Sequence, residues 1–128
     1  MTDQLDFHDG FVDGVFVSDS TARIFLRSVT GDKFTLVLAG VDALRVNELM
    51  KGNIILELAL LSVNQLDADF VFEIYGYSDE HKKKFVFEDW VEKAKQKGVH
   101  ALEITPSYGC TTSALFRSHT IVDGHVFA

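Results

Sequence analysis

The chain has 128 residues, of which 47% are hydrophobic and 24% are charged, and its formal net charge is −7. This length and composition are typical of one globular domain, residues 1–128, with a hydrophobic core of its own. The acidic charge argues against binding to nucleic acid or to anionic membranes, because both ligands need a basic protein surface.

The single cysteine excludes an internal disulfide and a metal site built from several cysteines. It fits a reducing, cytoplasmic environment. The first nine residues are acidic and hold no apolar stretch, so we expect no signal peptide. The most apolar segment, residues 54–61, is too short to span a membrane. No Gly-rich segment matches a nucleotide-binding loop, so we expect no cofactor.

The first part of the chain has the pattern of β-structure. Residues 11–17, 21–29 and 34–39 are apolar and β-rich, and short polar turns separate them. This spacing predicts an antiparallel meander. Arg23 and Arg27 fall on the same face of the second strand, so we expect that face to be solvated.

The middle of the chain is less regular. Residues 41–50 fit neither the helical nor the strand period and predict a short strand or a turn-rich connection. Residues 54–63 are mostly apolar and predict a central strand. Residues 70–77 leave two interpretations open, because their aromatic and β-branched content favours a strand, whereas Asp67 could cap a helix there.

We expect one long helix over residues 79–97. Ser78 is a favourable N-cap, an apolar stripe follows at helical spacing, and Gly98 is a favourable C-terminal cap. The competing interpretation pairs residues 70–77 with residues 84–90 as a hairpin, followed by a shorter helix. Phe85 lies off the apolar stripe of the long helix, which favours this alternative.

The last part of the chain returns to β-structure. Residues 99–104 predict a short strand that Pro106 ends, because proline cannot donate a backbone hydrogen bond. A Pro-Ser-Tyr-Gly turn leads to a further strand over residues 111–122, and we expect the final residues to be frayed. The fold class is therefore α+β: a mostly antiparallel sheet of about six or seven strands with one long helix near the C-terminal third.

Four residues are candidates for a binding site. His8 and Asp9 are adjacent near the N-terminus, and Tyr108 and Cys110 flank a glycine at the turn after the proline. Catalysis by the thiol would need a lowered pKa and a base in contact. No histidine or cysteine spacing predicts a metal site, and no set of residues forms a recognisable catalytic group. We therefore predict no catalytic residues.

Two segments together carry a resemblance. Phe7-His8-Asp9-Gly10 precedes the meander, and Leu102-Glu103-Ile104-Thr105-Pro106-Ser107-Tyr108-Gly109-Cys110 precedes the last strand. This layout resembles small, uncharacterised bacterial domains, some of which belong to the immunity-type proteins of polymorphic-toxin systems. The resemblance implies an intracellular, acidic, non-enzymatic protein that binds another protein. It implies no catalytic residues.

Three hypotheses about function follow. The first is a non-enzymatic bacterial domain that binds another protein, with Phe85 and Tyr77 as contact residues if they are exposed. The second is a small-molecule-binding or enzymatic domain in which His8, Asp9, Tyr108 and Cys110 meet. The third is a homodimer that pairs exposed sheet edges.

Overall fold

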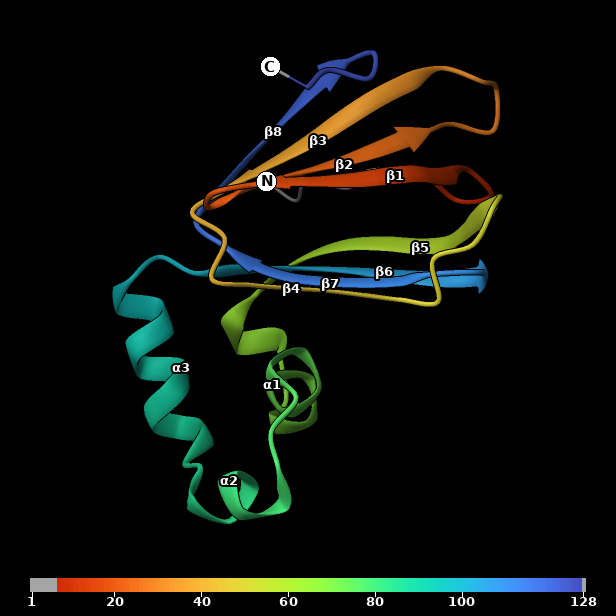
Figure 1. The fold of residues 1–128 in the computed structure, drawn as a ribbon. Coiled ribbons are helices and arrows are strands. Elements are labelled where there is room, and N and C mark those ends of the chain that lie inside the picture. The colour runs from red at the N-terminus through yellow and green to blue at the C-terminus, as the bar shows by residue number, and fades with distance from the viewer. Residues whose placement is uncertain (1–6, 128) are drawn as a thin grey trace.

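The computed structural model describes residues 7–127 (Figure 1). The first six residues lie outside this range. They make up most of the acidic N-terminal segment in which we expect no signal peptide. The described chain forms an eight-stranded sheet in the order β4-β7-β6-β5-β1-β2-β3-β8, and all of its strand pairs are antiparallel. The predicted α+β class is confirmed, but the sheet has more strands than we predicted.

Eight strands, three α-helices and one 3-10 helix follow one another along the described chain. They are β1 (Phe11–Ser18), β2 (Thr21–Arg27), β3 (Lys33–Ala39), β4 (Ala43–Asn47), β5 (Asn53–Ser62), the 3-10 helix η1 (Val63–Gln65), α1 (Ala68–Tyr75), α2 (Asp79–Lys84), α3 (Phe87–Gln96), β6 (His100–Tyr108), β7 (Thr111–Phe116) and β8 (Ser118–Asp123).

The sheet folds over on itself at a narrow seam between β1 and β5. These strands share only two residue pairs, Phe11 with Ile54 and Val12 with Asn53. On either side of this seam, the sheet forms two halves that face each other (Figure 1). We call β1-β2-β3-β8 the upper layer and β4-β7-β6-β5 the lower layer. The fold is therefore a two-layered sheet with the main core enclosed between its layers.

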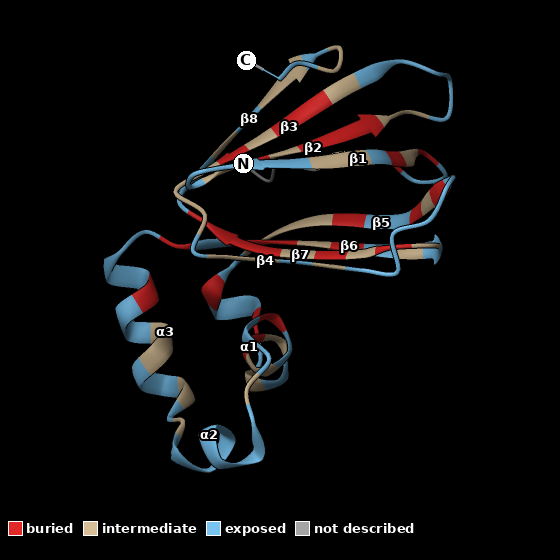
Figure 2. Cartoon of the chain, viewed as in Figure 1, coloured by how far each residue is buried: buried red, intermediate tan, exposed pale blue. Residues whose placement is uncertain are grey.

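The core follows the alternation of the strands. Ala22, Ile24 and Leu26 point inward from β2 and pack in one cluster with Leu102 and Ile104 of β6. All five side chains are fully buried, whereas the edge strands β4 and β8 contain no buried residue (Figure 2). The predicted meander of the first three strands is confirmed by their pairing.

The outer face of β2 is only partly solvated. Arg23 and Arg27 lie on it as predicted, but Phe25 between them is buried. The rings of His125 and Phe127 lie 5.2 and 4.8 Å from the Phe25 ring. The C-terminal segment is therefore packed against β2, and the expectation of a frayed end is wrong because an aromatic side chain is available to anchor it.

The additional strand arises where the predicted strand over residues 111–122 divides. The chain leaves the lower layer after β7 and enters the upper layer as β8, and Arg117 lies between the two strands. The Arg117 amide donates a hydrogen bond to the carbonyl of Ala39, 2.9 Å away. One segment with the pattern of a single strand thus serves two layers, because contacts between distant residues set the crossing point.

The predicted helix over residues 79–97 is also wrong. It is two short helices, α2 and α3, separated by an extended connection at Phe85 and Val86. The break lets the Phe85 ring pack against Phe72 and Tyr77, with centroids 5.3 and 5.5 Å apart. A continuous helix would have turned Phe85 away from the apolar stripe.

Residues 70–77 lie mainly in a helix, so the alternative hairpin is excluded as well. Asp67 caps α1, since its carboxylate accepts a hydrogen bond from the amide of Phe70. The helix ends at Gly76, which has left-handed backbone angles. Residues 41–50, where we predicted a short strand or a turn-rich connection, contain the short strand β4.

Pro106 does not end its strand, as β6 continues to Tyr108. The register between β5 and β6 shifts on both sides of Ile55, which pairs with Pro106. Such bulges accommodate a residue that lacks an amide donor. The predicted strand end is therefore replaced by an irregular but unbroken pairing.

The helices cover part of the outer face of the lower layer. A second hydrophobic cluster joins them to the sheet, and its buried members are Val63, Leu66, Ile74, Ala94, Val99, Ala101 and Leu115. Helix α2 contributes no buried residue (Figure 2). Among residues 7–127, no helix is long and apolar enough to cross a membrane.

One buried side chain fastens the seam. The Asn53 amide oxygen accepts hydrogen bonds from the amides of Met50 and Cys110, at 2.8 and 3.1 Å. Its nitrogen donates to the carbonyls of Met50 and Val12, at 2.6 and 3.2 Å. Asn53 thus joins the β4–β5 loop, the β6–β7 turn and β1. All of the hydrogen-bonding groups of this side chain are used, as burial requires.

The Asn53 contacts predict a strict need for glycine at position 109. Gly109 has a φ of +90°, and a β-carbon there would overlap the Asn53 amide oxygen and lie 3.0 Å from its α-carbon. We expect Gly109→Ala to lower the free energy of unfolding by about 3 kcal/mol or more, from backbone strain and overpacking combined. Denaturant unfolding measures this change.

Gly31→Ala is the matched control. Gly31 also lies in a hairpin turn, has a φ of +92°, and has no atom near the added β-carbon. It should therefore cost only the backbone strain, about 1–2 kcal/mol. Equal losses for the two variants would contradict the role of the Asn53 contact.

Candidate functional site

His8 and Asp9 lie together at the start of the chain's first strand. The His8 Nδ1 and Asp9 Oδ2 atoms are 3.2 Å apart, and both side chains are largely exposed. The Asp9 amide donates to the carbonyl of Ile55, and the Ile55 amide donates to the carbonyl of Gly10. This segment therefore borders β5 at the seam.

Tyr108 and Cys110 lie on the other side of β5. Tyr108 pairs with Ile54, and its side chain is 51% exposed. Cys110 is buried in the main core, with its sulfur 3.7 Å from the Thr112 hydroxyl. The thiol thus faces inward, whereas the phenol faces solvent.

The two pairs are near neighbours but not one cluster. Because β5 lies between them, the backbones of the two segments are about 9–10 Å apart, two strand spacings. Cys110 is also closed off from solvent, at 1% exposed. The binding role of these four residues stays a prediction.

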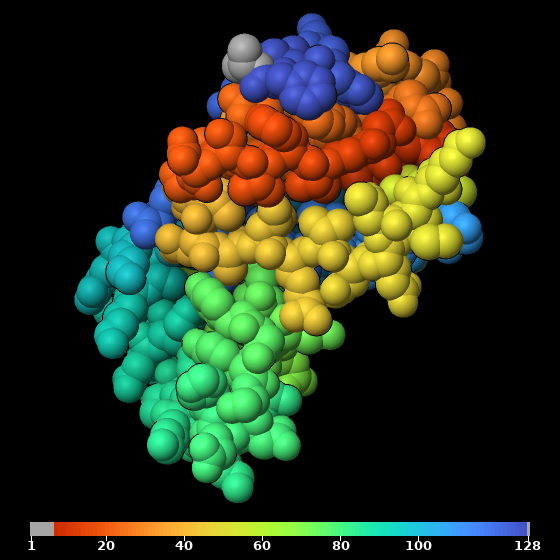
Figure 3. All heavy atoms as spheres, in the orientation of Figure 1, coloured from red at the N-terminus to blue at the C-terminus, as the bar shows by residue number. Residues whose placement is uncertain are grey.

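A second candidate surface lies on the helices. We call residues 63–97 the helical lobe, and this lobe projects from one side of the sheet (Figure 3). Its aromatic surface consists of side chains that are all only partly buried or exposed: Phe72, Tyr75, Tyr77, Phe85, Phe87 and Trp90. Aromatic residues in the core are by contrast closed, as Phe116 is.

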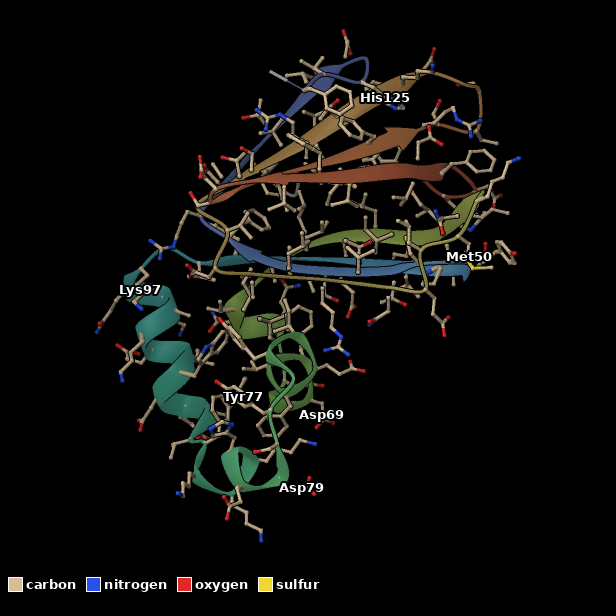
Figure 4. All side chains as sticks on the ribbon, in the orientation of Figure 1. Met50, Asp69, Tyr77, Asp79, Lys97 and His125 are labelled. Carbon is tan, nitrogen blue, oxygen red and sulfur yellow. The ribbon has the colours of Figure 1, made fainter. Side chains whose placement is uncertain are left out.

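The aromatic surface is held together by ring contacts between helices. Tyr77 lies between α1 and α3 (Figure 4), and its ring stacks on Tyr75 with the centroids 5.6 Å apart. Phe85 contacts Phe72 and Tyr77, while Phe87 stacks on Trp90 at 6.3 Å. The surface is thus a connected layer of rings.

Tyr75 marks where this layer meets the sheet. Its pKa is raised, first by burial and then by the negative charge of Asp42 and by Tyr77, while a hydrogen bond with Trp90 acts in the opposite direction. Tyr75 as a whole is 40% exposed.

A shallow pocket opens beside the aromatic surface. Its volume is about 410 Å³, and it is lined by Asp69, Phe72 and Glu73 of α1 and by Lys82 of α2. The Lys82 Nζ lies 5.6 Å from the centroid of the Phe72 ring, in a cation–π arrangement. The pocket therefore combines an aromatic face with charges of both signs.

Acidic side chains extend from this pocket to the sheet. The pKa of Glu103 on β6 is raised, first by its burial and then by repulsion from Glu57, Asp67 and Glu73. The guanidinium of Arg45 donates to the carbonyl of Glu73, 2.9 Å away, and is a nearby positive charge on the sheet side. The region between α1 and the outer face of the lower layer is thus electronegative.

Sequence reasoning identified only part of this surface. Phe85 and Tyr77 were candidates, and both lie on the aromatic surface, half-buried. Phe72 and Lys82 were missed, because they meet only when α2 folds back against α1. The off-stripe position of Phe85 was the one local signal of that arrangement.

No protein-family model, curated protein or solved structure matches this chain. Within the described residues, no group of three or more His, Cys, Asp or Glu side chains could hold a metal ion.

The burial of Cys110 predicts that its thiol reacts slowly in the folded protein. A chromogenic disulfide reagent should modify native Cys110 at least about a thousand-fold more slowly than it modifies the unfolded chain, because reaction needs the core to open. Ser107→Cys supplies the control, as it adds an exposed thiol to the same strand end and should give an additional fast phase. Comparable rates in native and unfolded protein would contradict the buried position.

The environment of Glu103 predicts that removing its negative charge stabilises the folded protein, by an amount that depends on pH. Because its pKa is raised on folding, ionised Glu103 destabilises the folded state, and this penalty grows as pH rises through the raised pKa. Glu103→Gln should therefore raise the melting temperature at pH 7 relative to wild type. The difference should shrink as pH falls and vanish below the ordinary glutamate pKa of about 4.3, where the carboxyl is protonated in both the folded and the unfolded state.

Glu92→Gln on the exposed side of α3 controls for the loss of one negative charge. It should leave the pH dependence of unfolding close to that of wild type, measured by thermal denaturation between the same pH values. A Glu103→Gln curve parallel to the wild-type curve would refute the electrostatic origin of the effect.

Proposed function

We propose that this protein acts by binding another protein through the aromatic surface of the helical lobe. The observation that carries the proposal is that six neighbouring aromatic side chains remain partly open on a projecting part of the fold. Interface centres are enriched in tyrosine, tryptophan and phenylalanine, and these residues supply most of the binding energy.

The position of the lobe supports this proposal. Helix α2 buries no side chain of its own, so its residues are available to a partner. The connection at Val86 is 51% exposed and lies beside Phe85 and Phe87. A charged rim surrounds these apolar groups, with Asp79 and Glu80 at the start of α2 and lysines at its end. Apolar centres with polar rims are typical of protein interfaces.

The finer form of the proposal is a bacterial, cytoplasmic protein of the immunity type, whose partner is a toxin. It rests on the acidic charge and on the resemblance carried by the His-Asp and Ser-Tyr-Gly segments. Co-expression with a toxin encoded beside its gene should restore growth. A homodimer through the exposed edges β4 and β8 is the competing mode of assembly, and light scattering distinguishes it from a monomer.

Val86→Asp tests the aromatic surface without loosening the fold. Val86 is the N-cap residue of α3 and makes no side-chain capping bond. Aspartate is a favourable N-cap, worth about 0.5–2 kcal/mol, so the variant should fold at least as well as wild type. It places a charge beside the rings, and we expect partner binding to fall by at least about ten-fold.

The measurement is quantitative affinity capture from a lysate of the source organism, followed by calorimetry with the captured protein. Val29→Asp is the matched control, because Val29 is 67% exposed in the β2–β3 turn on the other layer. A partner retained equally by wild type and both variants would place the interface elsewhere. No specific partner at all would argue against the proposed function.

A further inference from the structure

The ammonium group of Lys82 already lies in the pocket between α1 and α2. Asp69, Phe72 and Glu73 lie on one face of α1, since they are three and four residues apart. Lys82 reaches this face from α2, with its ammonium 5.6 Å from the centre of the Phe72 ring. Because the protein's own Lys82 occupies this position, the Phe72 ring can accept a positively charged group.

The two carboxylates of the pocket are not used by the protein itself. Within residues 7–127, no ion pair joins Asp69 or Glu73 to a basic side chain. Like charges four residues apart on a helix repel each other, so a cation placed between them would be stabilising. Lys82 remains over the ring instead and leaves both carboxylates open to an incoming group.

The surroundings favour a cation as well. Glu57 and Glu103 on the sheet and Asp67 at the start of α1 belong to the same electronegative region, as the raised pKa of Glu103 indicates. The chain as a whole carries a charge of −7. A basic partner would be attracted to this side of the lobe.

Building on the proposed protein-binding function, we propose that the pocket lined by Asp69, Phe72, Glu73 and Lys82 binds an arginine side chain of the partner, which displaces Lys82 from the Phe72 ring.

Arginine fits this pocket better than other cations. A guanidinium group is planar, so it stacks on an aromatic ring while its edge donates two hydrogen bonds to a carboxylate. A lysine would only replace one ammonium by another. Phosphate-bearing ligands are disfavoured, because Asp69 and Glu73 would repel them.

The test uses N-acetyl-arginine amide as the probe, titrated into the full-length protein and followed by NMR. Saturable shifts should occur at Phe72 and at the α1 amides around it. Lys82→Ala removes the competing cation and should tighten probe binding about two- to five-fold, the range expected for an exposed cation–π contact. Lys83→Ala removes the same charge from the same helix but does not line the pocket, so it should change the affinity by less than about two-fold.

The carboxylates are tested by the double variant Asp69→Asn with Glu73→Gln, which should weaken probe binding about three-fold or more. Equal affinities for the Lys82→Ala and Lys83→Ala variants would overturn the proposal, because attraction would then be non-specific. N-acetyl-lysine amide or spermidine binding as tightly as the arginine probe would also overturn it.

The outcome is separable from that of the proposed function. If Val86→Asp abolishes partner binding while the Lys82 and carboxylate variants leave the probe unaffected, the protein-binding surface stands and the arginine pocket fails. If the probe binds as described and no partner depends on Val86, the pocket stands and the wider aromatic interface fails.

Discussion

The seam between β1 and β5 is the constraint on which the rest of the fold depends, and the Asn53 side chain holds it. Two residue pairs alone would be a weak link between the two layers of the sheet. Asn53 adds four hydrogen bonds, two of them fully buried and two partly buried, that join β1, the β4–β5 loop and the β6–β7 turn. In a low-dielectric interior a fully satisfied polar group of this kind fixes one arrangement, because any other would leave donors or acceptors unpaired. Gly109 is the complement of this arrangement, since no side chain fits beside Asn53.

From the seam, the architecture leads to the helical lobe. Folding at β1–β5 turns the inner faces of both layers towards each other, so the outer face of the lower layer becomes available for α1 and α3. The inner residues of the lobe bury against Ala101 and Leu115, and Trp90 of the aromatic surface packs partly against the same cluster. The same helices thus contribute to stability through their buried residues, while their partly open rings form the proposed binding surface.

The break at Phe85 in the helix predicted over residues 79–97 connects the two functional proposals. The extended connection returns α2 towards α1, which places Phe85 among the rings and brings Lys82 over Phe72. An unbroken helix would form neither the connected aromatic surface nor the pocket. The proposed interface and the proposed arginine site are therefore consequences of one backbone irregularity, although they are tested by different variants.

The sequence by itself determined the α+β class, the antiparallel meander and the Ser78 cap of α2, because alternation and cap residues act within a few positions of the chain, and it offered Asp67 as a cap of α1 in only one of two interpretations. It could not decide the division of residues 111–122, the helical break at Phe85 or the packing of the C-terminal segment on Phe25. Each of these is chosen by contacts between residues far apart in sequence. The candidate residues divide in the same way: Phe85 and Tyr77 could be identified locally, whereas Phe72 and Lys82 became neighbours only in the tertiary structure. That structure also placed β5 between the His8–Asp9 pair and the Tyr108–Cys110 turn and buried the thiol, since strand order is set by the packing of the whole sheet.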